Sequence, residues 1–293
     1  MFTTSHFHDI FLSMDFHPLL IHLRAMQLLA GIALSLVIAL ISYRIKTISF
    51  SGALGMILVG TTIFGMGGII FAIPLLFFYF TSIILTAVKT SRKSIALLTF
   101  DKAGARDIWQ VLANGGIPAI CAIIYFATGN IIWFFPALAA LCEAAADTWA
   151  TEVGTLSSST PISIVSLKPV NPGQSGGVTA LGILAAVAGS VLTMLVAYWL
   201  GFLDKDLARF PLKLWMAAAN CGLAGSLLDS ILGGSLQAQY RCEICNRITE
   251  KTIHCALPTT LERGHKFINN DVVNFSSSLF AALVAAAIFV FGV

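Results

Sequence analysis

Carboxylates inside apolar segments are the first residues in this sequence that could do chemistry. Glu143, Asp147 and Thr151 recur every four residues, and this spacing puts them on one face of a helix. Ionisable groups within a membrane span are costly, and by default they mark a functional site. Two carboxylates on one face repel each other unless a cation or proton lies between them, and Mg²⁺ is the usual cation where phosphates are handled. The alternative is a carboxylate cluster that pairs with Lys or Arg for packing.

Further oxygen ligands occur in three other places. Asp229 lies in a segment rich in Gly and Ser, where small residues serve helix packing but a buried Asp needs a partner. Glu152 follows Asp147 on the same helix. Asp271 and Asn274 are three residues apart at the start of the last apolar segment, and N-capping of a helix by Asp271 or Asn270 is the competing interpretation. We predict Mg²⁺ ligands among Asp147, Glu152, Asp229, Asp271 and Asn274.

Two polar segments could bind phosphate. Lys168 is followed by Ser175, Gly176 and Gly177 directly before an apolar segment, and Gly-rich backbone at a helix N-terminus presents free N–H groups to an anion. A Pro/Gly turn that only starts the helix is the alternative. In the second segment, Lys102 and Arg106 can neutralise phosphate oxygens, and Asn114 adds an amide. Attraction to lipid headgroups is the alternative for this basic pair.

A cysteine cluster lies in a third polar loop. Cys242 and Cys245 form a CxxC pair that is followed by His254 and Cys255, so the loop offers the donors of a Cys₃His zinc site. The gap between the pairs is short for a zinc ribbon, and adjacent His and Cys seldom bind one ion. A reduced thiol cluster without metal is therefore the alternative.

The elements that position these residues are membrane helices. The chain is 57% hydrophobic and 11% charged, with a mean hydropathy of +0.88, whereas a soluble domain carries about 25% charged residues. No soluble basic domain is present, which excludes nucleic acid as a partner. The fold class is all-α, a polytopic helical bundle with seven or eight transmembrane segments. They are expected near 25–43, 51–66, 69–88, 110–127, 131–153, 177–200, 212–238 and 271–292.

The second segment is the uncertain one. Residues 51–66 are few for a span, and the glycines from Gly65 to Gly68 predict a break from the third segment. The segment could therefore span the membrane or re-enter it. With eight spans, thirteen of the seventeen Lys and Arg residues fall on one side. Such an asymmetry marks the cytoplasmic side.

This topology predicts the domain organisation. Residues 1–24 form a polar extracytoplasmic segment, and residues 25–293 form a single membrane domain with cytoplasmic loops at 89–109, 154–176 and 239–270. Both termini are expected outside. No cleavable signal peptide is evident, which favours the cytoplasmic (inner) membrane of a bacterial-type cell. The polar clusters then gather at the cytoplasmic face, where nucleotides and Mg²⁺ are found.

At these residues the sequence resembles the transmembrane protein 19-like family, whose characterised plant members are phytyl-phosphate kinases of tocopherol biosynthesis. The resemblance covers roughly residues 50–290, and the Cys242–Cys255 segment fits it as well. The matching stretches, in order along the chain, are Gln110–Gly115, Asp147–Gly154, Lys168–Gly177, Gly225–Gly233 and Asn270–Asn274.

The resemblance implies a membrane-bound kinase. Its reaction would transfer the γ-phosphate of a nucleoside triphosphate, such as CTP, to an isoprenyl monophosphate such as phytyl phosphate, giving the diphosphate. Asp147, Asp229 and Lys168 are then the candidate catalytic residues, and Mg²⁺ is the expected cofactor, with structural Zn²⁺ as a second candidate metal. The partners would be the two substrates and the lipid bilayer. The sequence leaves the oligomeric state open, a homodimer included.

Two other functions remain open at this point. Intramembrane Asp residues and Gly-broken helices also suit an ion-coupled transporter, which should have polar groups near mid-membrane with access from both faces. A CTP-dependent lipid cytidylyltransferase would use similar metal and phosphate groups but would release pyrophosphate. The location of the polar clusters at one face favours an enzyme over the transporter.

Overall fold

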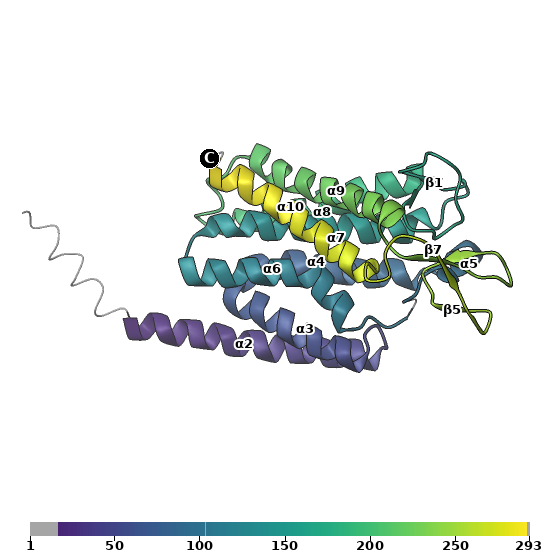
Figure 1. The fold of residues 1–293 in the computed structure, drawn as a ribbon. Helices are drawn as coiled ribbons and strands as arrows, with labels where there is room; N and C mark the ends of the chain where they lie inside the picture. Colours follow the sequence, from purple (N-terminus) through teal and green to yellow (C-terminus); the bar gives the residue numbers. More distant parts are fainter. Residues whose placement is uncertain (1–16, 103, 292–293) are drawn as a thin grey trace, which may run out of the picture.

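Long α-helices lying side by side make up most of the structure, a computed structural model that describes residues 17–102 and 104–291 (Figure 1). The long helices are α2 (His17–Arg44), α3 (Phe50–Thr62), α4 (Gly68–Ala87), α6 (Ile108–Thr128), α7 (Phe134–Gly154), α8 (Ala180–Gly201), α9 (Leu212–Ser235) and α10 (Asn270–Phe291). Short helical elements are η1 (Ile63–Gly67), α5 (Ser91–Leu97) and η2 (Ile131–Trp133). The predicted all-α membrane bundle is confirmed.

The predicted break in the second apolar tract lies at Gly68. α3 continues through the π-helical turn η1, and Gly68, the first residue of α4, has a φ of +71°, which favours glycine. Gly31 of α2 packs against Gly65, and Gln27 lies beside Gly68. Since the apolar stretch of α2 begins at Arg24, α3 and η1 accompany nearly its whole length. They therefore pack as a helix alongside α2 and are nearly as long as its apolar stretch.

The break adds one candidate pass to those that length and composition indicate, and α9 is the remaining long helix of the bundle. Length and apolar composition mark six stretches of the described chain as able to cross a membrane, and one of them is the 38-residue stretch Phe50–Ala87. Because this stretch is broken at Gly68, it provides two candidate passes. α9 is outside the six, since small and polar residues such as Asn220 make it less apolar, but it packs against α7, α8 and α10.

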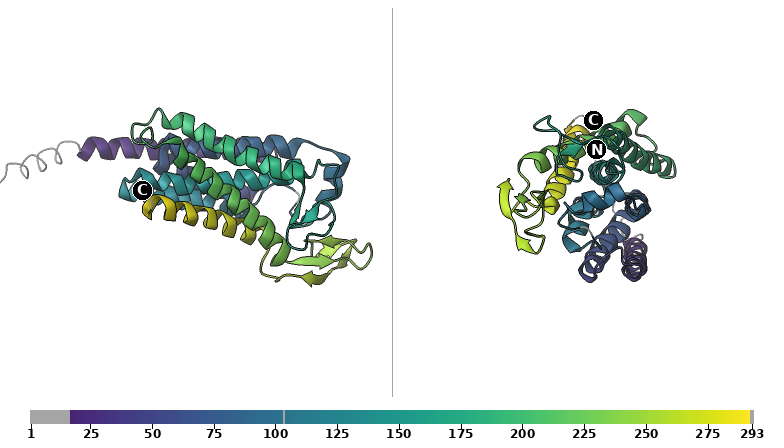
Figure 2. Two further views of the ribbon diagram at one scale, coloured as in Figure 1. Left: turned by 90° about the horizontal axis from the view of Figure 1, so that it is seen from above. Right: turned by 90° about the vertical axis from the view of Figure 1, so that its right-hand side faces the viewer.

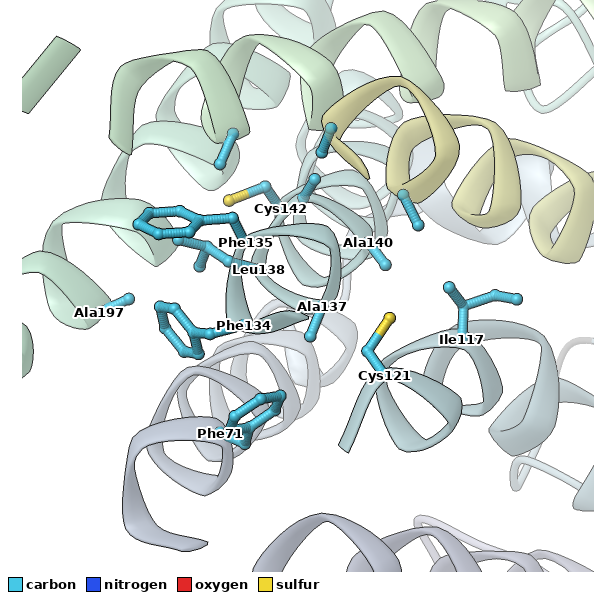
Figure 3. Packing of buried hydrophobic residues seen from close by; sticks show 14 of the residues in the cluster. Phe71, Ile117, Cys121, Phe134, Phe135, Ala137, Leu138, Ala140, Cys142 and Ala197 are labelled. Carbon is cyan, nitrogen blue, oxygen red and sulfur yellow. The ribbon is translucent and has the colours of Figure 1, made fainter. Parts of the chain in front are cut away.

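Helix α7 is the centre of the bundle. Of its apolar stretch, 78% is buried, and α4, α6, α8, α9 and α10 all pack against it. Alanines along α7 allow this close approach, as small residues do in membrane interfaces. Figure 3 shows Phe134 of α7 on the side of Phe71 of α4 and Ala197 of α8, while Phe135 stacks on Phe289 of α10. The ring centroids of Phe71 and Phe134 are 5.2 Å apart.

The strands and the loops that carry them gather at one end of the bundle, which we call the polar end. β1 (Ile162–Ser163) pairs antiparallel with β2 (Gly177–Val178). A second group follows α9: the sheet β4–β3–β7 and the hairpin β5–β6. Its strands are β3 (Gln239–Arg241), β4 (Ile248–Thr249), β5 (Ile253–His254), β6 (Leu257–Pro258) and β7 (Thr260–Arg263). Figures 1 and 2 show the strands and α5 at one end of the bundle, and the C-terminus of α10 at the other.

The first apolar segment lies where it was predicted. Its apolar stretch runs from Arg24 to Arg44, against an expected 25–43, and helix α2 itself extends further toward the N-terminus, to His17. Most of the predicted N-terminal segment, residues 1–16, lies outside the described residues, as do residues 292 and 293.

Candidate functional site

A cavity of about 1310 Å³ opens among the helices at the polar end. Its wall comes from segments far apart in the sequence, including α4, α7, the ends of α8 and α9, and the start of α10. The predicted site residues that line it are Lys102, Arg106, Asn114, Asp147, Glu152, Ser175, Gly176, Gly177, Asp229, Asp271 and Asn274. The fold thus brings residues from five of the sequence motifs to one cavity.

Parallel packing of α7 and α9 puts Asp147 and Asp229 at one level. Both helices run toward the polar end, and Gly225 of α9 lies against the Glu143 side chain of α7. One helical turn further along, the two helices present Asp147 and Asp229 to the cavity. Among the described residues, neither carboxylate has a Lys, Arg or His within ion-pair distance. This pair is therefore not the packing cluster with a basic partner that the sequence left open.

Glu143 differs from Asp147 although it shares the helix face. Its side chain is 1% exposed and is not part of the cavity wall. Neither carboxylate oxygen has a hydrogen-bond partner in the described chain. Glu143 therefore lies on the same face of α7 as Asp147, one turn further from the polar end and outside the cavity.

The start of α10 lies beside Asp147 of α7 and Asp229 of α9 and adds polar residues to the same part of the cavity wall. The Asn269 side chain caps this helix by accepting a hydrogen bond from the Val272 amide (3.0 Å), so neither Asn270 nor Asp271 is the N-cap. Asn274 is then directed to the cavity, where its amide donates to Asp229 Oδ2 (3.0 Å) in the orientation that satisfies its neighbours.

Basic partners engage the remaining acids of the wall. Lys102 forms ion pairs with Asp271 and with Asp107 (2.7 Å). Partial burial opposes the charge, but these hydrogen bonds raise the pKa of Lys102. Glu152 accepts from Lys93 Nζ (2.5 Å) and from the Thr86 hydroxyl (2.5 Å). Asp147 and Asp229 are therefore more available to a metal ion than Glu152 or Asp271.

Arg106 is the basic residue best placed to meet an anion. Its backbone is held on both sides, since its N–H donates to Thr47 O (3.1 Å) and its carbonyl accepts from the Ser49 amide (2.9 Å). Burial lowers the pKa of its guanidinium, which remains charged at neutral pH. Lys46, Lys89, Arg92, Arg106 and Lys266 line the cavity with no carboxylate within 4.0 Å in the described part of the chain.

The glycine loop before α8 differs from the predicted phosphate cradle. Thr179 caps α8 by accepting from the Gly182 amide (3.0 Å), so one N–H group of the first turn already has a partner within the chain. The Gly177 N–H is likewise bonded to Gln174 O (2.9 Å). Gly176, with a φ of +79°, packs against Gly234 at the end of α9. The loop therefore closes the cavity wall, and its N–H groups are less free than expected.

Two further predicted residues have different surroundings. Lys168 is exposed and is not part of the cavity wall, so the structure does not bring it together with the other candidates. Asn114 lines the cavity, but its amide donates to Gln110 O in its own helix (2.9 Å).

The cysteine cluster converges outside the cavity. The ligand atoms of Cys242, Cys245, His254 and Cys255 all lie within 4.8 Å of one another. His254 Nδ1 is 3.5 Å from Cys245 Sγ and 3.3 Å from Cys255 Sγ. The Cys242 thiol donates to His254 O (3.8 Å), and hydrogen bonding with the Cys245 backbone lowers the pKa of this thiol to about 6. Such a donor set fits a tetrahedral thiolate-rich metal site.

Two cavity residues were missed from the sequence. Lys93 is 5% exposed and also donates to the carbonyls of Leu85 (2.9 Å) and Thr86 (3.1 Å), which end α4. Glu250, from the cysteine loop, accepts from Ser175 Oγ (2.7 Å) and Gln237 Nε2 (2.8 Å). Burial raises the pKa of Glu250. In the sequence, Lys93 counted only as one of the basic loop residues that indicate the cytoplasmic side. Glu250 belongs to no recognisable motif.

The fold and the cavity define a multi-pass integral membrane protein with an acidic and basic cavity at one end. The family described as integral membrane protein DUF92 matches residues 33–282, and the chain belongs to this family. This is the transmembrane protein 19-like and phytyl-phosphate kinase family that the motifs indicated, so the resemblance is confirmed.

Relatives occur in plants and archaea. The chain is 31% identical to Protein PGR of Arabidopsis thaliana over 292 residues, which cover 90% of this chain and 98% of the plant protein. It is 30% identical to an uncharacterized membrane protein of Methanocaldococcus jannaschii, over 71% of this chain and 82% of the archaeal one. No solved structure matches the chain.

Proposed function

We propose that this protein is a membrane-bound kinase that transfers the γ-phosphoryl group of a nucleoside triphosphate, such as CTP, to an isoprenyl monophosphate such as phytyl phosphate. A phosphate oxygen of the lipid attacks Pγ, and the bond from Pγ to the β-phosphate bridging oxygen breaks. The products are the lipid diphosphate and a nucleoside diphosphate. Since the acceptor is already an anion, the reaction needs positioning and charge neutralisation rather than a strong base.

The observation that carries this proposal is that the cavity has a polar part and an apolar part. Its polar part contains Asp147, Asp229 and five basic side chains without a carboxylate partner in the described chain. The same cavity continues between α2, α3, α4 and α7, where apolar side chains line it. They are Ile38, Val59, Phe64, Leu75, Leu76 and Phe78. An amphiphile with a phosphate head and a long apolar tail fits such a cavity, whereas a nucleotide alone uses only the polar part.

The residues then have distinct roles. Asp147 and Asp229 would hold Mg²⁺, because two carboxylates without a basic partner need a cation, and Asn274 would orient Asp229. When bound, Mg²⁺ neutralises charge on the nucleotide phosphates. Arg106 would bind phosphate oxygens of the transferring group. Lys102 would keep Asp271 and Asp107 in place at the cavity mouth.

The orientation of the chain belongs to the same proposal. Thirteen of the seventeen basic residues fall in loops or helix ends at the polar end, which favours a cytoplasmic location for that end. The active site would then face the cytoplasmic pool of nucleotide, with both termini on the other side of the inner membrane.

The test is a turnover assay with the purified protein in detergent. It is incubated with Mg²⁺, each nucleoside triphosphate, and phytyl, geranylgeranyl or farnesyl monophosphate, and products are identified by mass spectrometry. We expect lipid diphosphate together with nucleoside diphosphate. Asp147→Asn and Asp229→Asn should each lower turnover by about 100-fold or more, since each would remove a ligand that stabilises transition-state charge.

Asp206→Asn is the matched control, because this exposed acid lies in the loop before α9, at the opposite end of the bundle. It should turn over like the wild type. A nucleotidyl-lipid with pyrophosphate would make the protein a cytidylyltransferase. If a folded protein gives no product with any substrate pair, the kinase proposal is wrong and ion-coupled transport becomes the better hypothesis.

A further inference from the structure

The strands after α9 form a small module that lacks an apolar core of its own. Residues 239–263 hold five short strands, and the buried residues among them are Gln239, Tyr240, Cys242 and Thr249. A segment of this size cannot bury enough apolar surface to keep one fold, and small modules of this kind depend on a disulfide or a metal ion. The cysteines of the module are free thiols.

Two tight turns bring four donor atoms together in this module. In the first, the Asn246 N–H donates to Cys242 O (2.8 Å), and Asn246 has a φ of +57°. In the second, Cys255 and Ala256 connect β5 to β6 with φ values of +51° and +64°. A two-residue hairpin of this type prefers Asn-Gly, so Cys-Ala is unusual here. Surroundings that favour the turn are needed to keep it.

Adjacent His and Cys residues seldom bind one ion, but the second turn directs the side chains of His254 and Cys255 to the same point. Neighbouring side chains in a strand point to opposite faces, but the left-handed conformation at Cys255 turns its thiol back toward His254. The result is a distance of 3.3 Å between Cys255 Sγ and His254 Nδ1. Tetrahedral zinc with ordinary Zn–S and Zn–N bond lengths needs ligand atoms roughly 3.3–3.8 Å apart. Donors that all lie within 4.8 Å need only a small adjustment.

We propose that Cys242, Cys245, His254 and Cys255 bind one zinc ion, which fixes the strand module against the wall of the cavity. One group of contacts between module and wall lies between the two ligand pairs. Thr249 Oγ1 donates to Thr99 O (2.8 Å), and the Glu250 amide donates to the same carbonyl (2.9 Å). Zinc at the four donors thus holds the segment that precedes Lys102 and Arg106.

The module also holds the glycine loop. Glu250 accepts from Ser175 Oγ (2.7 Å), and Gln239 Nε2 donates to Ser175 O (3.2 Å). Gln174 donates to Gln239 Oε1 (3.2 Å). The zinc ion would therefore position two walls of the cavity without touching the substrate. The site stands on its own geometry, so it is independent of the kinase proposal.

Metal analysis of the purified protein tests the site directly. Elemental mass spectrometry should give close to one zinc per chain, and Cys245→Ser and His254→Ala should each lower this to less than about one fifth. Cys221→Ser, which changes a thiol within α9, should keep its zinc. His254→Cys should also keep it, because a Cys₄ set binds zinc as well. This rescue separates loss of a ligand from general misfolding.

Hydrogen exchange tests the positioning role without any turnover assay. After zinc is removed with a chelator, amide exchange should become faster in residues 239–263, 99–101 and 171–177, while α7 keeps its protection. Re-addition of zinc should reverse the change. The proposal is wrong if the wild type holds no zinc, holds iron instead, or forms a disulfide within the cluster. It is also wrong if His254→Ala keeps its zinc, or if the wall segments exchange at the same rate with and without metal.

Discussion

At the scale of single residues, the charged side chains of the cavity wall are of two kinds. Some form ion pairs with one another, and others have no oppositely charged partner in the described chain. Lys93 and Glu152 neutralise each other, as do Lys102 and Asp271. Arg106, by contrast, has a fixed backbone and a charged head group with no carboxylate within 4.0 Å in the described chain. A desolvated charge without a partner is costly, and binding of an anion removes that cost.

Replacement of Arg106 by Gln should therefore weaken phosphate binding. A hydrogen bond to a charged group contributes about 1.5–3 kcal/mol, so KM for the phosphorylated substrates should rise by about tenfold or more. Steady-state kinetics on wild type and variant measure this. Lys168→Gln is the comparison, since Lys168 is exposed and away from the cavity, and its KM should stay within about twofold. Equal effects of the two substitutions would contradict the assignment of Arg106.

Which site residues the sequence predicts depends on how local their signals are. Asp147 and Asp229 were found because an acid within an apolar segment is conspicuous in any sequence. The role of Lys93 depends on α4 and α7 meeting, and no sequence pattern records that contact. Lys168 was included because it precedes the glycine loop, but it follows the turn that ends at Leu167 and lies exposed, outside the cavity wall. Its place in the loop depends on the path of the chain around that turn, which the order of residues alone does not predict.

At the scale of helices, small residues on α9 determine how Asp147 and Asp229 meet. A Cβ at Gly222 would lie 2.4 Å from Cys142 Cβ and 2.7 Å from the Glu143 backbone N. Because a backbone atom cannot move aside, any side chain there separates α7 from α9. The sequence predicted these glycines as packing residues. Their partner helix could not be predicted, since the pattern of small residues alone does not name it.

Gly222→Ala should therefore lower stability and activity together. Overpacking of this kind costs about 1–3 kcal/mol, so the thermal unfolding temperature in detergent should fall, and turnover should fall with it as Asp229 shifts from Asp147. Gly116→Ala is the matched control in α6, because the nearest atom to its new Cβ is Phe275 Cε2 at 4.0 Å. Unfolding temperatures that match between the two variants would show that the α7–α9 contact is looser than described.

At the scale of the whole molecule, the helices enclose one cavity that has a polar part and an apolar part. Hydropathy and the glycine cluster near Gly68 predicted seven or eight transmembrane segments, and the described chain has eight long helices. The cavity itself could not be predicted, since it is the space left between α2, α3, α4 and α7 after they pack. Ile38 of α2 lines its apolar part. The tail of an isoprenyl substrate would lie there.

Ile38→Trp should shorten the tail that the cavity accepts. The larger side chain fills space that a long isoprenyl chain needs but a short one does not, and each buried CH₂ contributes about 0.8 kcal/mol to binding. We expect KM for phytyl monophosphate to rise by about tenfold or more, since two displaced CH₂ groups already suffice, while KM for a five-carbon prenyl monophosphate stays nearly constant. Leu40→Trp, on the same helix but 57% exposed, should change neither value. If Ile38→Trp raises KM for both chain lengths equally, the tail does not lie between α2 and α4, and the apolar part of the cavity serves another purpose.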